Sequence, residues 1–142
     1  MARNIFKGLG VALITPFTSD GSVDFKSLTC LVEHLIDNGA DFLCILATTS
    51  EAPCLSAYEK EEVKKHVIDI NRGRLPILMG CGGNNTKAIV DELKNSDWRG
   101  IDGVLSVCPY YNKPSQEGLY QHFKAIAEAS PLPVVLYNVP GR

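Results

Sequence analysis

The stretch LPILMGCGGNNTKAIVDELKNS, residues 75–96, contains the structural unit that decides the fold. It begins with an apolar run at 75–79, passes through a glycine-rich turn, and continues with apolar residues at helical spacing over 86–96. A short, continuous apolar run is typical of a strand buried on both faces, and a 3.6-residue period predicts an amphipathic helix. We therefore expect these residues to form one strand–turn–helix unit.

The same unit recurs through the chain of 142 residues. Strands are expected at residues 8–14, 42–46, 75–79, 103–107 and 133–137, and helices at residues 24–38, 56–71, 86–96 and 115–129. Strand starts are roughly 30 residues apart, the size of one strand–helix unit. Ser56 and Glu59 have the spacing of a capping box at the start of the second helix. This alternation predicts right-handed crossovers and a parallel sheet.

Two closures of such a sheet fit the pattern, a doubly wound open sheet and a (β/α)8 barrel. A barrel typically needs about 250 residues, so a chain of 142 residues would supply a little over half of one. Periodicity alone does not separate the two closures. Because no linker or low-complexity stretch interrupts the pattern, residues 1–142 are expected to lie within one domain.

Composition narrows the class of function. The chain has 45% apolar residues, 21% charged residues and a net charge of −2, without a basic stripe, so neither nucleic acid nor a membrane is an expected partner. The apolar run at 9–17 is too short to span a bilayer and is a poor signal sequence. Five cysteines never pair as C-x-x-C, so no disulfide framework, metal site or cofactor is indicated, and a reducing cytoplasm is expected.

Polar and aromatic side chains gather where the predicted strands end. They are Thr48 and Thr49 after the second strand, Asn84 after the third, Tyr110 and Tyr111 after the fourth, and Tyr137 at the end of the fifth. The C-terminal ends of parallel strands converge on one face, where ligands bind. Taken singly, each residue also has an ordinary explanation as a helix cap, a turn residue or a packed aromatic.

Other polar groups are expected to be structural. The charged residues at 59–65 predict a solvated helix face with i,i+4 pairing. His34, His66 and His122 fall inside predicted helices and are expected to be surface or packing residues rather than ligands. The turn at 80–83 lacks the Walker pattern, so its alternative role as a phosphate cradle has weak support.

Five blocks, taken together, resemble the 4-hydroxy-tetrahydrodipicolinate synthase family, also called dihydrodipicolinate synthase. The blocks are GVALITPF at 10–17, TTSE at 48–51, GCGGNNT at 80–86, PYYNKP at 109–114 and YNVPGR at 137–142. The resemblance covers essentially the whole chain. It implies a (β/α)8 barrel of the α/β class, of which this chain would hold about the first five strands and four helices.

The resemblance also implies a reaction, the condensation of pyruvate with L-aspartate 4-semialdehyde in lysine biosynthesis. In that family pyruvate forms an imine with a lysine, and the derived enamine attacks the aldehyde. Tyr137 matches the general acid/base tyrosine and Thr48 the threonine that bridges it to a second tyrosine. Tyr111 matches that second tyrosine, which the family reaches across a tight dimer interface. A homo-oligomer, dimeric or tetrameric, is therefore expected of the full-length protein.

The remaining matches concern binding and regulation. Thr49 matches the threonine that binds the pyruvate carboxylate, and Arg142 matches the arginine that receives the carboxylate of the semialdehyde. Tyr110 matches an aromatic residue that packs across the interface. Asn84 and Tyr110 keep the pattern of the lysine-binding allosteric site, but Lys60 and Ala88 depart from it, so feedback inhibition by lysine is not implied.

Two further departures matter. Ala47 and Ser50 stand where the family usually has glycines, and since a Cβ restricts positive φ, we expect this loop to be reshaped. The family's imine-forming lysine follows on the sixth strand, and no lysine up to Arg142 matches it. We therefore expect the 142-residue chain to be the N-terminal half of such an enzyme and to be inactive alone.

Two alternatives remain open at this point. N-acetylneuraminate lyase and keto-deoxy-sugar aldolases share the threonine pair and the strand-five tyrosine, but they typically lack an arginine such as Arg142. A non-catalytic half-barrel that acts as an interaction module would explain the missing lysine. The presence of Thr48, Tyr111 and Tyr137, which have no use without the imine, favours the enzyme.

Overall fold

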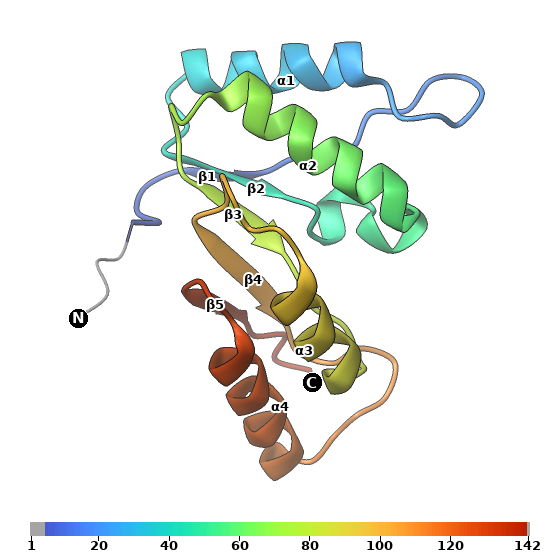
Figure 1. Ribbon diagram of the computed structural model, residues 1–142, viewed down its shortest axis with the longest axis vertical. Helices are drawn as coiled ribbons and strands as arrows, with labels where there is room; N and C mark the ends of the chain where they lie inside the picture. The colour runs from blue at the N-terminus through green and yellow to red at the C-terminus, as the bar shows by residue number, and fades with distance from the viewer. Residues whose placement is uncertain (1–4, 142) are drawn as a thin grey trace.

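The computed structural model describes residues 5–141, and these form one sheet covered by helices (Figure 1). The strands are β1 (Gly10–Ala12), β2 (Phe42–Ile45), β3 (Ile77–Gly80), β4 (Gly103–Val107) and β5 (Val134–Tyr137), and the helices are α1 (Phe25–Asp37), α2 (Ala57–Asn71), α3 (Thr86–Asn95) and α4 (Gln116–Ala129). Every predicted strand and helix is confirmed, with small differences at the ends. The sequence pattern did not predict two short 3-10 helices, η1 (Thr48–Ser50) and η2 (Ala52–Cys54).

The order of the strands separates the two closures. The sheet runs β1-β2-β3-β4-β5, and each strand pairs in parallel with the next strand along the chain. A doubly wound sheet reverses its strand order at a switch point, whereas a (β/α)8 barrel adds every new strand on the same side. The described residues therefore form part of a barrel, in which α1 packs against α2 and α3 packs against α4.

Local sequence signals place the helix ends. The capping box at the start of α2 is present: the Glu59 N–H donates to Ser56 Oγ over 3.2 Å, and the Ser56 N–H donates to Glu59 Oε2 over 2.8 Å. Asp24 caps α1 by accepting from the Ser27 N–H over 3.0 Å. Each of these carboxylate or hydroxyl groups satisfies a backbone donor that the first turn of a helix leaves unpaired.

Helices and strands enclose two apolar clusters. The first lies under α1 and α2 and includes Leu28, Val67 and Ile77. The second lies under α3 and α4 and includes Leu93 and Ile126. Trp98 and Leu132, both partly buried, pack against both clusters and so join them into a continuous core.

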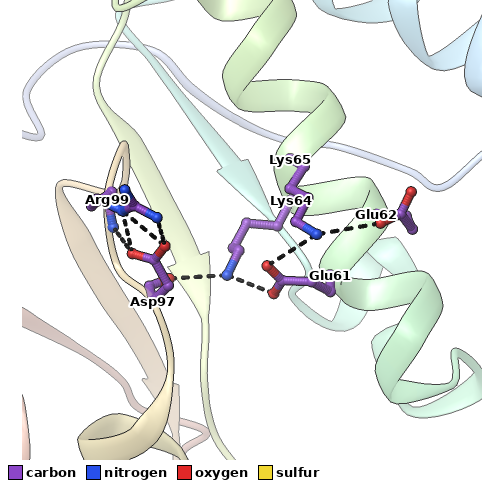
Figure 2. A network of polar contacts seen from close by, with 6 residues as sticks. All are labelled: Glu61, Glu62, Lys64, Lys65, Asp97 and Arg99. Atoms are coloured by element: carbon purple, nitrogen blue, oxygen red, sulfur yellow. Dashed lines mark hydrogen bonds and ion pairs between the residues drawn. The ribbon is translucent and has the colours of Figure 1, made fainter.

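Lys64 links the two helix pairs and corrects one prediction. The sequence pattern predicts a solvated position, but the Lys64 side chain is only 5% exposed. Its ammonium donates to the Asp97 carbonyl over 2.9 Å and pairs with Glu61 over 2.6 Å. Figure 2 shows this side chain reaching from α2 to the loop that follows α3. The side chain is buried while its charged end is paired, which is how a buried lysine is tolerated.

The Asp97 loop is shaped to present its carbonyl. The Asp97 carboxylate accepts hydrogen bonds from the Arg99 guanidinium, one of them from Nε over 2.9 Å. These hydrogen bonds lower the pKa of Asp97 to about 2. The carboxylate is therefore occupied on its own loop, and Lys64 meets the backbone oxygen instead (Figure 2).

Replacement of Lys64 tests this link. We expect Lys64→Ala to lower the free energy of unfolding by about 2 kcal/mol, because the Asp97 carbonyl loses its charged donor inside the protein. The exposed neighbour Lys65 pairs with Glu62 at 3.5 Å and is the matched control. Lys65→Ala should change the free energy by less than about 0.5 kcal/mol. Urea unfolding followed by Trp98 fluorescence measures both, and equal effects would contradict the assignment.

Candidate active site

One cavity of about 740 Å³ lies at the C-terminal ends of the strands. It brings together four of the predicted site residues, Thr48, Thr49, Tyr110 and Tyr137. Tyr111 and Asn84 are not among the residues that line it. Arg142, the predicted semialdehyde-binding residue, lies outside the described residues. Two threonines of one loop and two tyrosines from the ends of two other strands therefore share a single space, as the convergence of parallel strand ends predicts.

The threonine loop, residues 46–51, has positive φ angles at both of its ends. Ala47 is extended, with φ −90° and ψ −168°, and neither Ala47 nor Ser50 has positive φ. The left-handed positions are instead Leu46, with φ 52°, and Glu51, with φ 54°. The positive φ angles thus fall at the residues that flank Ala47 and Ser50, and the reshaping of this loop relative to the family stays a prediction.

Ser50 holds this loop through its side chain, which the sequence analysis missed. Its hydroxyl donates to the Leu13 carbonyl over 2.6 Å, and its own carbonyl accepts from Thr15 Oγ1 over 2.7 Å. Ser50 and Thr15 are 2% and 4% exposed. These paired bonds tie the threonine loop to the segment after β1 in a place without competing water. The sequence feature that could have indicated this role is a small hydroxyl residue at a position where the family usually has glycine.

Gly80 allows the threonine loop to approach β3. A Cβ at this position would lie 2.2 Å from the Leu46 carbonyl oxygen, a distance that no side chain tolerates. The glycine-rich turn therefore begins with a residue that the close approach of two backbones requires. This accounts for Gly80 by packing, without a phosphate ligand.

Tyr137 is positioned by its backbone. Its carbonyl accepts from the Cys108 N–H over 3.2 Å, which extends the β4–β5 pairing beyond Val107. Its side chain is 46% exposed. In residues 5–141 no hydrogen bond joins the hydroxyl groups of Thr48, Tyr111 and Tyr137. The delivery of Tyr111 to the site of a neighbouring subunit stays a prediction.

Tyr111 occupies an unusual backbone conformation. Its φ is 70° and its side chain is 91% exposed. The Asn112 N–H donates to the Tyr110 carbonyl over 3.0 Å, a three-residue bond of the γ-turn kind, in which positive φ is rare and strained. The Asn84 side chain donates to the same carbonyl over 3.0 Å. We call residues 110–112 the tyrosine turn.

The thiols and charged groups on the cavity wall restrict its chemistry. Burial raises the pKa of the Cys44 thiol to about 11. Burial, followed by the neighbouring Glu92, raises the pKa of the Cys81 thiol to about 12. Both thiols are therefore neutral at physiological pH and are poor nucleophiles. Lys64 also lines the cavity, but its ammonium is held by Glu61 and the Asp97 carbonyl.

The cavity wall also carries the side chains of Lys60 and Glu92 and the hydroxyl groups of threonine and tyrosine, and hydroxyl groups both donate and accept protons. Within residues 5–141 no cluster of three or more histidine, cysteine, aspartate or glutamate side chains is arranged to hold a metal ion. No helix in this range is long and apolar enough to cross a membrane. The described cavity thus brings threonine and tyrosine hydroxyl groups together with charged side chains of both signs.

Comparison with known proteins gives the same picture at the level of sequence. A model described as the dihydrodipicolinate synthetase family matches residues 5–142. The 4-hydroxy-tetrahydrodipicolinate synthase of Phocaeicola vulgatus is 58% identical over 142 residues, which are 100% of this chain and 48% of that protein. The synthase of Bacillus subtilis is 49% identical over 137 residues, 96% of this chain and 47% of that protein. The chain thus spans about half the length of the curated relatives that it matches.

Solved structures share the fold. Dihydrodipicolinate synthase DapA-2 from Bacillus anthracis has a TM-score of 0.89 and 50% identity, over 96% of this chain and 47% of that one. The chloride-inhibited synthase from Acinetobacter baumannii, solved in complex with pyruvate, has a TM-score of 0.89 and 50% identity, over 95% and 46% of the two chains. The five strands are therefore part of a (β/α)8 barrel. With a family match over residues 5–142, the chain belongs to the dihydrodipicolinate synthetase family.

Proposed function

We propose that this chain supplies the proton-relay and carboxylate-binding residues of a 4-hydroxy-tetrahydrodipicolinate synthase, which condenses pyruvate with L-aspartate 4-semialdehyde in lysine biosynthesis. The observation that carries the proposal is the convergence of Thr48, Thr49 and Tyr137 on one cavity, in a chain 58% identical to such a synthase along its whole length. The pyruvate complex of the synthase from Acinetobacter baumannii supports pyruvate as the first substrate.

The hydroxyl groups would move the protons of the reaction. The Tyr137 hydroxyl donates a proton to the leaving oxygen of pyruvate as the imine forms, and it takes a proton back at a later step. Thr48 links Tyr137 to a second tyrosine, Tyr111 of the neighbouring subunit. A chain of hydroxyls can reverse direction because each member both donates and accepts. The 46% exposure of Tyr137 leaves it open to a substrate in the cavity.

The carboxylates of the two substrates would be bound separately. The Thr49 hydroxyl and the backbone N–H groups of its loop donate hydrogen bonds to the carboxylate of pyruvate. Ser50 fixes this loop to the segment after β1. Arg142 pairs with the carboxylate of the semialdehyde through two parallel hydrogen bonds, a geometry that a guanidinium provides and an ammonium does not.

The covalent step needs the amine of a lysine. An unprotonated lysine attacks the C2 carbonyl of pyruvate, water leaves, and the imine loses a proton from C3 to give the enamine. Lys64 lines the cavity, but its side-chain nitrogen pairs with Glu61 and donates to the Asp97 carbonyl. Lys60 lines the cavity as well, and neither lysine matches the imine-forming lysine of the family. We therefore assign the imine to a lysine in the half of the relatives that this chain does not cover.

A chimera tests the proposed activity. Residues 1–142 would be joined to the C-terminal half of the Phocaeicola vulgatus synthase. The first half of that synthase is the part that matches this chain. We expect the chimera to consume pyruvate with aspartate semialdehyde and to prefer that aldehyde to sugar aldehydes, because Arg142 pairs with its carboxylate. A coupled assay measures both rates. Preferential turnover of sugar aldehydes would instead place the chain with the sugar aldolases.

A mixing experiment tests the assignment of the relay. In the chimera, Tyr137→Phe and Tyr111→Phe should each lower kcat by at least about a hundredfold, because a proton donor is lost. If Tyr111 serves the neighbouring subunit, a mixture of the two variants forms heterodimers with one intact site. Such a mixture should recover about a quarter of the wild-type activity, given random pairing of subunits in a two-fold dimer. No recovery after exchange of subunits would show that Tyr111 acts within its own chain.

Trapping with borohydride tests the origin of the amine. The chain of 142 residues, incubated with pyruvate and reduced, should show no pyruvate-sized gain in mass. The chimera under the same conditions should gain one pyruvate on a lysine of its C-terminal half, which is the positive control. A stable adduct on a specific lysine of residues 1–142 would overturn the assignment.

A further inference from the structure

His122 connects α4 to the start of α3. It is only 4% exposed, and its Nδ1 lies 2.8 Å from the hydroxyl of Thr86, the first residue of α3. The other ring nitrogen, Nε2, is buried and has no hydrogen-bond partner among residues 5–141. One of the two nitrogens therefore makes a specific polar contact, inside a helix interface that is otherwise apolar around Ile126.

The contact continues from Thr86 to the tyrosine turn. Thr86 directly follows Asn85, which caps α3 by accepting from the Ala88 N–H over 3.2 Å. Asn84 precedes the cap and donates its side-chain N–H to the Tyr110 carbonyl over 3.0 Å. A path of hydrogen bonds and adjacent residues thus runs from His122 to residues 110–112.

The tyrosine turn has little else to hold it. Tyr111 has a φ of 70° and is 91% exposed, so packing of its own side chain does not offset the strained backbone. A strained conformation persists only where the surroundings determine it. The Asn84 and Asn112 donors both converge on the Tyr110 carbonyl, which makes that oxygen the fixed point of the turn.

We propose that His122 is a positioning residue for the tyrosine turn, acting through Thr86 and Asn84. The hydrogen bond from Nδ1 to Thr86 fixes the first turn of α3, and this places the Asn84 donor that holds the Tyr110 carbonyl. The consequence for catalysis rests on the proposed function, in which Tyr111 completes a proton relay. The consequence for the order of the turn does not depend on it.

Two amide substitutions separate positioning from general packing. Asparagine places its amide near the position of Nδ1, and glutamine places its amide near Nε2. His122→Asn should therefore keep the contact with Thr86, although asparagine is a poor helix former and lowers stability. His122→Gln should lose the contact with less effect on the helix. Thr86→Val removes the same contact from the other side.

A second threonine–histidine pair provides the matched control. His66 of α2 meets Thr29 of α1 through Nε2 at 2.8 Å, in the helix pair that lacks the tyrosine turn. His66→Asn moves the polar group away from the Thr29 hydroxyl, because the shorter asparagine amide does not reach the position of Nε2. It therefore removes a hydrogen bond of the same kind from a different place in the fold.

Hydrogen exchange of the chimera tests the positioning directly. In His122→Gln and Thr86→Val, the backbone amides of the peptide spanning residues 109–114 should exchange at least about fivefold faster. The reason is that the hydrogen bond from the Asn84 side chain to the Tyr110 carbonyl opens more often. In His122→Asn and His66→Asn its exchange should match the wild type. Unchanged exchange in both His122→Gln and Thr86→Val would overturn the proposal, as would an equal increase in His66→Asn. This readout decides the proposal even if the chimera shows no synthase activity.

Kinetics then test the catalytic consequence. In an active chimera, His122→Gln and Thr86→Val should lower kcat about tenfold through misplacement of Tyr111. The KM for pyruvate should stay within about twofold of the wild type, since Thr49 is untouched. His122→Asn should restore most of kcat despite its lower stability. Loss of activity in His122→Asn equal to that in His122→Gln would show that His122 acts through packing alone.

Discussion

The parallel ladder in chain order is the constraint on which the rest of the structure depends. Each strand pairs with the next one along the chain, from Gly10 opposite Phe42 to Val107 opposite Tyr137. Because all strands run in one direction, every loop that follows a strand opens at the same edge of the sheet. The threonine loop and the end of β5 therefore reach one cavity although they are far apart in sequence.

Backbone contacts at that edge set the detailed shape of the site. Gly80 lets β3 lie against the Leu46 carbonyl, and the left-handed φ of Leu46 turns the chain into η1. Ser50 then fastens this loop to the segment after β1. These contacts involve three neighbouring strands, so the position of Thr48 is a property of the assembled sheet. A change at Gly80 would move Thr48 without touching its side chain.

The sequence predicted the regular elements and the residues that share the cavity because both depend on local patterns. Apolar periodicity located the strands and α-helices but not the two 3-10 helices, and the capping box located the start of α2. The strand order and the roles of Lys64 and Ser50 depend on contacts between distant segments, which a single sequence does not encode locally. Lys64 lies among charged neighbours, and only the position of the Asp97 loop makes it a buried donor. The family resemblance, rather than periodicity, favoured the barrel.

The chemistry of the described residues implies a division of labour within the proposed enzyme. Threonine and tyrosine hydroxyl groups line the cavity and can move protons, whereas its two thiols are poor nucleophiles. Burial keeps the Cys44 and Cys81 thiols protonated, and the ammonium of Lys64 is engaged by its partners. Lys60 also lines the cavity, and neither it nor Lys64 matches the imine-forming lysine of the family. The proposed function therefore assigns the covalent step to a lysine of another segment. In that case the contact between His122 and Thr86 would hold the tyrosine turn in place before that lysine acts.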